Sequence, residues 1–153
     1  EKRDRVEDAM HATRAAVEEG IVPGGGVALI RCADAVNDAV TASADDDEKT
    51  GAVSVFKSLK APLAQIAGNA GASSELVGET VFMEDGPQGW NAATEEYQDL
   101  MESGVIDPKK VVRCALQNAA STAGLLLTTE AMVADDPDEE KPQMPMGPGM
   151  PGM

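Results

Sequence analysis

The sequence predicts a mainly α-helical fold, and three observations carry that prediction. Apolar and small residues recur at steps of three and four in several segments, which gives a helix one apolar face. Residues typical of helix ends, such as proline, serine, aspartate and glycine, stand at the borders of these segments. Only four of the 153 residues are aromatic. The core must therefore consist of Ala, Val, Leu, Ile and Met, which suits close-packed helices better than a β-sandwich.

Two helices are predicted on either side of a glycine-rich turn. The first covers residues 2–19 and ends at Gly20, and its apolar stripe is Val6, Ala9, Met10, Thr13, Ala16 and Val17. The opposite, more polar face carries Arg5, Asp8, Ala12, Ala15 and Glu19. The turn over residues 21–26 leads into a second helix near residues 25–40, whose stripe is Ala28, Leu29, Cys32, Ala33 and Val36.

Three further helices follow an acidic run that we expect to be an exposed loop, residues 41–50. Asp47 is the predicted N-cap of a third helix that reaches residue 60, because aspartate accepts hydrogen bonds from the first free amides of a helix. Pro62 fits the first turn of a fourth helix, which ends near residues 68–71. Ser73 or Ser74 would then open a fifth, short helix that reaches residue 81.

The helical pattern is lost over residues 83–97, where residues 90–93 are expected to form a short extended piece. Asp107 and Pro108 predict a strong helix start, with the carboxylate as N-cap and proline at the first helical position. The helix that follows has the clearest apolar stripe of the chain: Val111, Val112, Ala115, Leu116, Ala119, Ala123 and Leu126. Residues 131–133 are expected to form a terminal strand.

Charge and composition exclude several classes of function. The net charge of −15 disfavours a nucleic-acid surface or an anionic membrane face, since both are held by clustered Lys and Arg. Cys32 and Cys114 are too few for a disulfide framework and are expected to be buried free thiols in a reducing compartment. Without a signal peptide or an initiator methionine, the chain is expected to be a piece of a longer polypeptide. Its ending, rich in Pro, Gly and Met, is expected to be disordered.

Four places in the sequence could carry chemistry, and each has a plain structural alternative. Residues 24–26 are three glycines before a helix, which suit either close approach to an anion or a tight turn, although no phosphate-loop or dinucleotide motif is complete. Asp107 could cap its helix and also accept a hydrogen bond from a ligand hydroxyl. Asp8 could be an ordinary solvated charge, and His11 a donor or a surface residue. Residues 91–93, Asn-Ala-Ala, could let backbone amides reach a flat ring or could form a turn.

Several sequence blocks resemble the C-terminal part of a group I chaperonin, the GroEL type. The blocks cover residues 5–9, 11–20, 24–31, 61–63, 91–97 and 106–108. The resemblance implies three parts: residues 1–18 as the exit helix of the intermediate domain, 19–135 as the C-terminal half of the equatorial ATP-binding domain, and 136–153 as a flexible Gly/Pro/Met-rich tail. The fold it implies is a helical bundle like the equatorial domain, with a short strand element.

The same resemblance assigns roles to individual residues. Asp8 matches the catalytic aspartate that positions or activates the water attacking the ATP γ-phosphate. Gly25 matches a backbone contact to the nucleotide, and Asp107 matches a carboxylate that contacts the ribose. The adenine-side contacts match Asn91, Ala92 and Ala93. The phosphate loop and the ligands of Mg²⁺ belong to the family's N-terminal half, so no metal ligand is expected within these residues.

The resemblance therefore implies an ATP-dependent chaperonin subunit. Intact, it would bind and hydrolyse ATP in a cytoplasmic double ring of identical subunits. Its further partners would be the co-chaperonin GroES and unfolded client proteins, bound through an apical domain outside this segment. Alone, the segment is expected to hydrolyse no ATP. The alternative is a non-catalytic acidic helical interaction module, and a cysteine-dependent enzyme is a more distant one.

Overall fold

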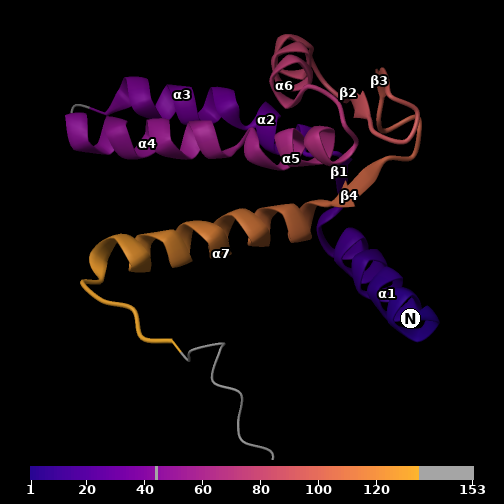
Figure 1. Cartoon of the computed structure of the whole chain (residues 1–153), viewed down its shortest axis with the longest axis horizontal. Coiled ribbons are helices and arrows are strands. Elements are labelled where there is room, and N and C mark those ends of the chain that lie inside the picture. Colours follow the sequence, from indigo (N-terminus) through magenta and orange to yellow (C-terminus); the bar gives the residue numbers. More distant parts are fainter. Residues whose placement is uncertain (44, 135–153) are drawn as a thin grey trace, which may run out of the picture.

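The computed structural model describes residues 1–43 and 45–134, and helices dominate it as predicted (Figure 1). The helices are α1 (Lys2–Glu19), α2 (Val27–Arg31), α3 (Ala33–Ala42), α4 (Asp46–Ser58), α5 (Ala61–Asn69), α6 (Ser74–Met83) and α7 (Lys109–Thr128). The strands are β1 (Ile21–Pro23), β2 (Gln88–Asn91), β3 (Glu96–Asp99) and β4 (Ile106–Pro108). The predicted tail lies outside the described residues.

Two antiparallel strand pairs organise the helices. β1 pairs with β4, with Val22 opposite Asp107, and β2 pairs with β3 as a hairpin. Figure 1 shows the β1–β4 pair at a junction, with α1 and α7 leaving it on one side and the segment α2–β3 on the other. The junction thus joins parts of the chain that are far apart in sequence.

The core is small and almost wholly aliphatic, as the composition predicted. It gathers side chains from α2, α5, α6, β2 and the residue after β3: Val27, Ile30, Leu63, Ala67, Val77, Val81, Trp90 and Leu100. Gly89 permits this packing, because a Cβ at that position would lie 2.4 Å from Cγ2 of Val27. The hairpin β2–β3 is therefore seated directly on the first turn of α2.

The predicted packing face of α1 is wrong except at Ala16, which is half-buried. Val6 is 71% exposed and Val17 83% exposed, whereas the half-buried residues of α1 are Ala12, Ala15, Ala16 and Glu19. This side contacts β4 and α7, since small alanine side chains let the helix approach closely. Asp8 lies four residues before Ala12 and therefore shares this side of the helix.

The helices between the two strand pairs differ from prediction mainly at their ends. The second predicted helix is broken at Cys32 into α2 and α3. The predicted loop shrinks because α3 continues to Ala42 and α4 begins at Asp46. The N-cap of α4 is Asp45, not Asp47, and its carboxylate accepts from the Asp47 amide at 2.8 Å. The acidic residues that follow lie in the first turn, where the helix dipole favours them. Ser73 caps α6 as predicted.

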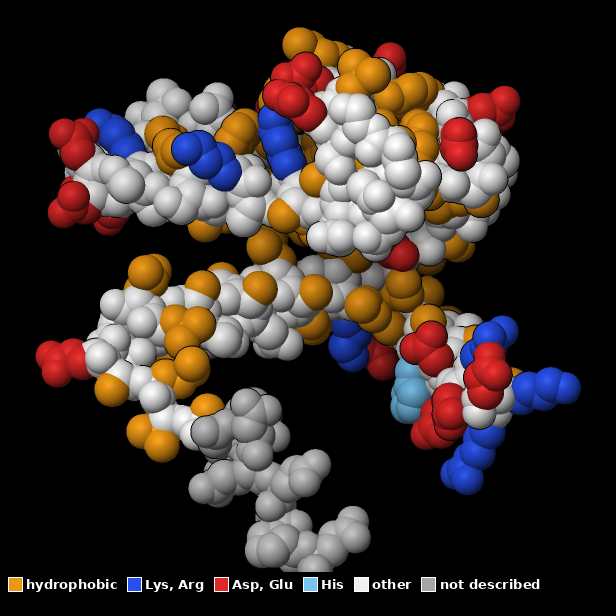
Figure 2. Space-filling model, viewed as in Figure 1, with side chains coloured by type: hydrophobic (Ala, Val, Ile, Leu, Met, Phe, Trp, Pro, Cys, Tyr) orange, Lys and Arg blue, Asp and Glu red, His pale blue; other side chains and the backbone are white. Residues whose placement is uncertain are grey.

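Asp107 is not the N-cap of α7. The cap position is Pro108, without a side-chain cap, because the Asp107 backbone is committed to the strand pair with β1. Most of the apolar stripe of α7 remains uncovered, although Val112 and Leu116 are half-buried, and Figure 2 shows hydrophobic side chains along this helix. Leu126, for example, is 56% exposed. The strand expected at residues 131–133 does not form.

The two thiols are less buried than predicted. Both cysteines are free, but Cys32 is exposed and Cys114 is half-buried. Within residues 1–43 and 45–134, no three side chains of His, Cys, Asp or Glu gather closely enough to hold a metal ion. Over the same residues, no helix combines the length and the apolar character needed to cross a membrane.

Two ion pairs fasten α1 to α7. Arg113 donates from Nη2 and Nε to the two carboxylate oxygens of Glu19, at 2.6 and 3.0 Å, and Lys110 pairs with Glu18. The hydrogen bond from Arg113 holds the pKa of Glu19 below its ordinary value of 4.5. The stabilisation from Glu19 is therefore fully present above the ordinary pKa and is lost as the pH falls through the lowered one.

We expect Glu19→Gln to lower the stability of the chain at pH 7 and to make unfolding less dependent on pH between 5 and 2, about the range over which a stabilised carboxylate is protonated. The measurement is the urea midpoint as a function of pH. Glu102→Gln is the control, because Glu102 forms no ion pair among the described residues. Equal pH dependence in the two variants contradicts the prediction.

Candidate functional site

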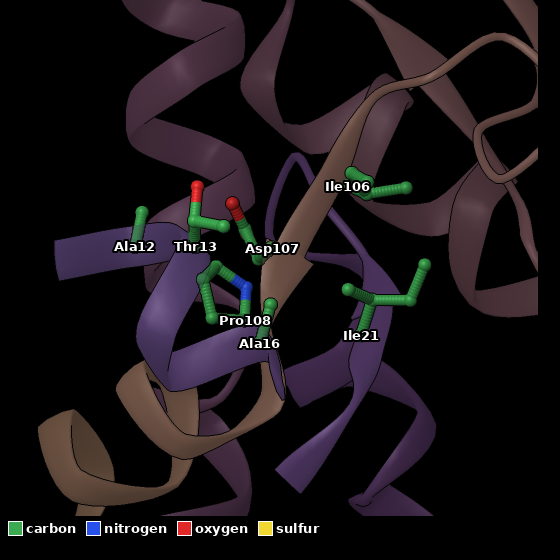
Figure 3. Close-up of a pocket in the computed structure, with 7 residues that line it drawn as sticks. All are labelled: Ala12, Thr13, Ala16, Ile21, Ile106, Asp107 and Pro108. Atoms are coloured by element: carbon green, nitrogen blue, oxygen red, sulfur yellow. The ribbon is translucent and has the colours of Figure 1, made fainter. Parts of the chain in front are cut away.

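Asp107 lies beside a cavity of about 180 Å³ between α1 and the β1–β4 pair. The strand ladder that holds it continues beyond both ends: the Lys109 amide donates to the Gly20 carbonyl at 3.0 Å, and the Gly24 amide to the Val105 carbonyl at 2.9 Å. The cavity is lined by Ala12, Thr13, Ala16, Ile21, Ile106, Asp107 and Pro108 (Figure 3). Two alanines of α1 leave this space open because their side chains are small.

The polar atoms of the cavity are few and point the same way. Figure 3 shows the Thr13 hydroxyl and the Asp107 carboxylate directed to the same side. The Thr13 hydroxyl donates to the Ala9 carbonyl at 2.7 Å, so its oxygen is left to act as an acceptor toward a ligand. Partial burial raises the pKa of Asp107 above its ordinary value of 3.8, and no cation among the described residues pairs with it. A carboxylate in this setting suits a ligand that donates hydroxyl groups.

The three consecutive glycines form a tight turn, as the simpler of the two interpretations predicted. The Val27 amide donates to the Gly24 carbonyl at 3.1 Å, and Gly25 and Gly26 have positive φ angles of 62° and 82°. A Cβ on Gly24 would lie 3.0 Å from the Val105 carbonyl oxygen. The helix after the turn has only five residues, so its dipole is too short to make an anion site by itself.

Residues 91–93 also form a tight turn, at the tip of the β2–β3 hairpin. The Asn91 side-chain oxygen accepts from the Ala93 amide at 2.9 Å, and the Asn91 carbonyl accepts from the Glu95 amide at 2.8 Å. Glu95 takes a positive φ of 59° to close the turn. Because the Ala93 amide is already used, any contact of this turn with a ligand must involve other atoms.

The glycine turn connects the predicted site residues. Gly24 is bonded to Val105, two residues before Asp107, and a Cβ on Gly25 would lie 3.7 Å from the carbonyl oxygen of Trp90, next to Asn91. The strand with Asp107, the glycine turn and the hairpin tip are therefore neighbouring segments. Asp8 is separate from the cavity lining: it is exposed, one helical turn before Ala12.

Sequence reasoning missed the contribution of α1 to this cavity. Ala12 and Ala16 line it, and they are four residues apart, the spacing of neighbours on one helix face. Two small residues at this spacing are a signal of close helix approach, but the larger residues Val6 and Val17 favoured another face. A second, larger cavity of about 420 Å³ lies between α2 and α7 and is mostly apolar, with Leu29, Cys32 and Leu116 among its lining residues.

We expect Asp107→Asn to raise the stability of the chain at pH 7. The raised pKa means that the native carboxylate is destabilised relative to the unfolded chain, so its unfavourable contribution grows as the pH rises from the ordinary pKa to the native one. Asparagine keeps the shape and removes the charge. Thermal unfolding at pH 7 and at pH 3 tests this. The variant should have a higher Tm than the unsubstituted chain at pH 7 and nearly the same Tm at pH 3. Asp99→Asn is not a suitable control, because Asp99 accepts two amides. The control is Asp38→Asn, since Asp38 is exposed and lies beyond the first turn of α3.

A comparison with known protein families identifies the relatives of this chain. The model of the TCP-1/cpn60 chaperonin family matches residues 1–137, which include all the candidate site residues and every helix and strand that the structure describes. The match also agrees with the sequence blocks that resemble group I chaperonins. The chain therefore belongs to the TCP-1/cpn60 chaperonin family, and its role is that of a chaperonin.

Proposed function

We propose that this chain forms the adenosine side of the ATP site of a chaperonin subunit and supplies its catalytic carboxylate. The observation that supports this most is the half-buried, unpaired Asp107 carboxylate beside a cavity, next to the glycine turn and the hairpin tip. In this proposal Asp107 accepts hydrogen bonds from the ribose hydroxyls, and the Gly25 backbone passes along the nucleotide. The adenine lies against the turn formed by Asn91, Ala92 and Ala93.

The size and charge of the cavity suit a part of ATP rather than the whole molecule. Ligand pockets commonly enclose about 300–1,000 Å³, and this one encloses about 180 Å³. Its lining holds no Lys or Arg that would bind phosphate. The phosphate grip and the ligands of Mg²⁺ would therefore come from parts of the chaperonin polypeptide beyond these 153 residues. Mg²⁺ bound with ATP would offset phosphate charge as the bond breaks.

In this proposal Asp8 acts from α1 after a movement of that helix. It lies on the same side of α1 as the cavity-lining Ala12, but nearer the N-terminus of the helix and in solvent. A shift of α1 toward the nucleotide would bring the carboxylate over the phosphate end, where it would orient a water molecule and accept its proton. The site would then be complete only after this closure.

The assembly implied by this function is a cytoplasmic double ring of identical subunits that assists protein folding. Client proteins and the co-chaperonin GroES would be bound by other parts of the subunit. The uncovered apolar side chains of α7 and the apolar cavity between α2 and α7 support burial against the rest of the subunit, since such surfaces rarely face water.

Calorimetric titration of ATP with Mg²⁺ tests the proposal. The 153-residue chain alone should bind weakly at best and show no turnover, whereas the complete chaperonin should bind and hydrolyse ATP. Asp107→Ala in the complete protein should weaken binding of both ATP and adenosine. Micromolar binding with turnover by the isolated chain would contradict an incomplete site, and unchanged adenosine affinity in the variant would contradict the role of Asp107.

A further inference from the structure

Arg31 makes an unusual set of contacts at the end of α2. Its guanidinium donates to three backbone carbonyls: from Nη1 to Val81 at 2.8 Å, from Nε to Gly86 at 2.9 Å and from Nη2 to Gln88 at 2.8 Å. The bonds to Val81 and Gln88 are partly buried. Arg31 forms no ion pair among the described residues, so this side chain is committed to backbone.

The three carbonyls belong to consecutive pieces of the chain. Val81 is in the last turn of α6, where helix carbonyls have no partner within the helix. Gly86 lies in the turn after the helix, and Gln88 is the first residue of β2. One side chain therefore fixes the end of α6, the turn and the start of the hairpin relative to α2.

This clamp joins two parts of the proposed nucleotide site. α2 begins directly after the glycine turn, and β2 ends at Asn91. The two parts meet where Gly25 approaches Trp90: a Cβ added to Gly25 would lie 3.7 Å from the Trp90 carbonyl oxygen. Core packing of Gly89 on Val27 brings the hairpin to α2. The Arg31 bonds hold the chain that enters the hairpin, together with the bond from the Leu100 amide to the Pro87 carbonyl at 3.1 Å.

We propose that Arg31 is a positioning residue for the adenine side of the site: it holds the entry of the β2–β3 hairpin so that Asn91, Ala92 and Ala93 stand at a fixed place beside the glycine turn. This inference rests on the proposed ATP function. Arginine suits the task because its planar group carries donors in several fixed directions. A lysine would keep the charge and reach one of the three carbonyls.

The first test does not involve nucleotide. Amide hydrogen exchange in the hairpin, residues 88–99, is compared in the 153-residue chain and in Arg31→Lys and Arg31→Ala. Both variants should speed exchange in the hairpin by about tenfold, because each loses two or three charge-assisted hydrogen bonds. Exchange in α1 and α7 should stay unchanged. Arg14→Ala is the control, since Arg14 is an exposed arginine with none of these contacts.

The second test uses the complete chaperonin with ATP. Arg31→Lys should raise the KM for ATP about tenfold and change kcat less than twofold, because the reacting phosphate is remote from the adenine. It should also weaken discrimination of ATP from GTP, which a general loss of stability would not do. Arg14→Ala should leave all three values unchanged.

The two tests distinguish failure of the Arg31 proposal from failure of the proposed ATP function. Unchanged hairpin exchange in both variants overturns the clamp whatever ATP does. Faster exchange with unchanged KM and unchanged discrimination overturns the positioning role, although the clamp itself stands. If the unsubstituted chaperonin fails to bind ATP, the proposed function and the positioning role are both overturned, while the exchange data still decide whether the clamp exists.

Discussion

Replacing Asp8 with asparagine in the complete chaperonin should lower the ATP turnover number by about 10²–10⁴-fold, the range typical for loss of a general base. Asparagine keeps the size of the side chain but cannot accept a proton from water. ATP affinity should change little, because Asp8 stands apart from the cavity that holds Asp107. Steady-state hydrolysis together with equilibrium ATP binding measures both quantities.

The matched control is Glu7→Gln, which removes a neighbouring carboxylate from another side of α1. Glu7 is exposed and lies 4.0 Å from His11, so its loss should leave turnover within twofold, as is usual for an exposed surface group. If Asp8→Asn also leaves turnover within that range, the catalytic role is refuted. That result is the one expected of a non-catalytic helical interaction module.

The second large effect is on stability. Gly26→Ala should lower the free energy of unfolding by about 3 kcal/mol, from a left-handed backbone that disfavours Cβ and from overpacking. The φ angle of Gly26 is 82°, and the added Cβ would lie 2.7 Å from the backbone nitrogen of Leu63, a fully buried core residue. Backbone at this place cannot move aside without disturbing α5. Urea unfolding of the 153-residue chain measures the loss.

Gly51→Ala is the control for the same chemical change. Gly51 lies within α4, and its added Cβ would meet nothing within 4 Å. In this variant the free energy of unfolding should rise by about 0.5–1 kcal/mol, because alanine is the better helix former. A loss at Gly26 no larger than about 1 kcal/mol would mean that the clash is relieved and that positive φ alone sets the penalty.

Some helix ends could be predicted, because their signals are local. Pro62 in the first turn of α5 and Ser73 at the cap of α6 act through neighbours within four residues. Asp107 fits the same local rule for a helix start, but the prediction that it caps α7 is wrong. Its backbone pairs with Val22, and no pattern around Asp107 announces a partner so distant in sequence.

The packing side of α1 could not be predicted for a related reason. Its own residues contain two usable faces, and the choice depends on β4 and α7, which lie far along the chain. The apolar stripe with Val6 and Val17 looked stronger, but alanines allow the closer approach. The roles proposed for Asp8, Gly25 and Asp107 rest on resemblance to a family, whereas the Arg31 clamp had no sequence signal, since its partners are backbone atoms.

The antiparallel pairing of Ile21–Pro23 with Ile106–Pro108 sets the order in which this chain acquires its structure. Within this segment, α1 is synthesised before β4 and α7, the elements on which it packs. The segment from α2 to β3 can collapse in the meantime, since its contacts lie within itself. In the 153-residue chain we therefore expect α1 to settle last, in a final folding step that closes one long loop.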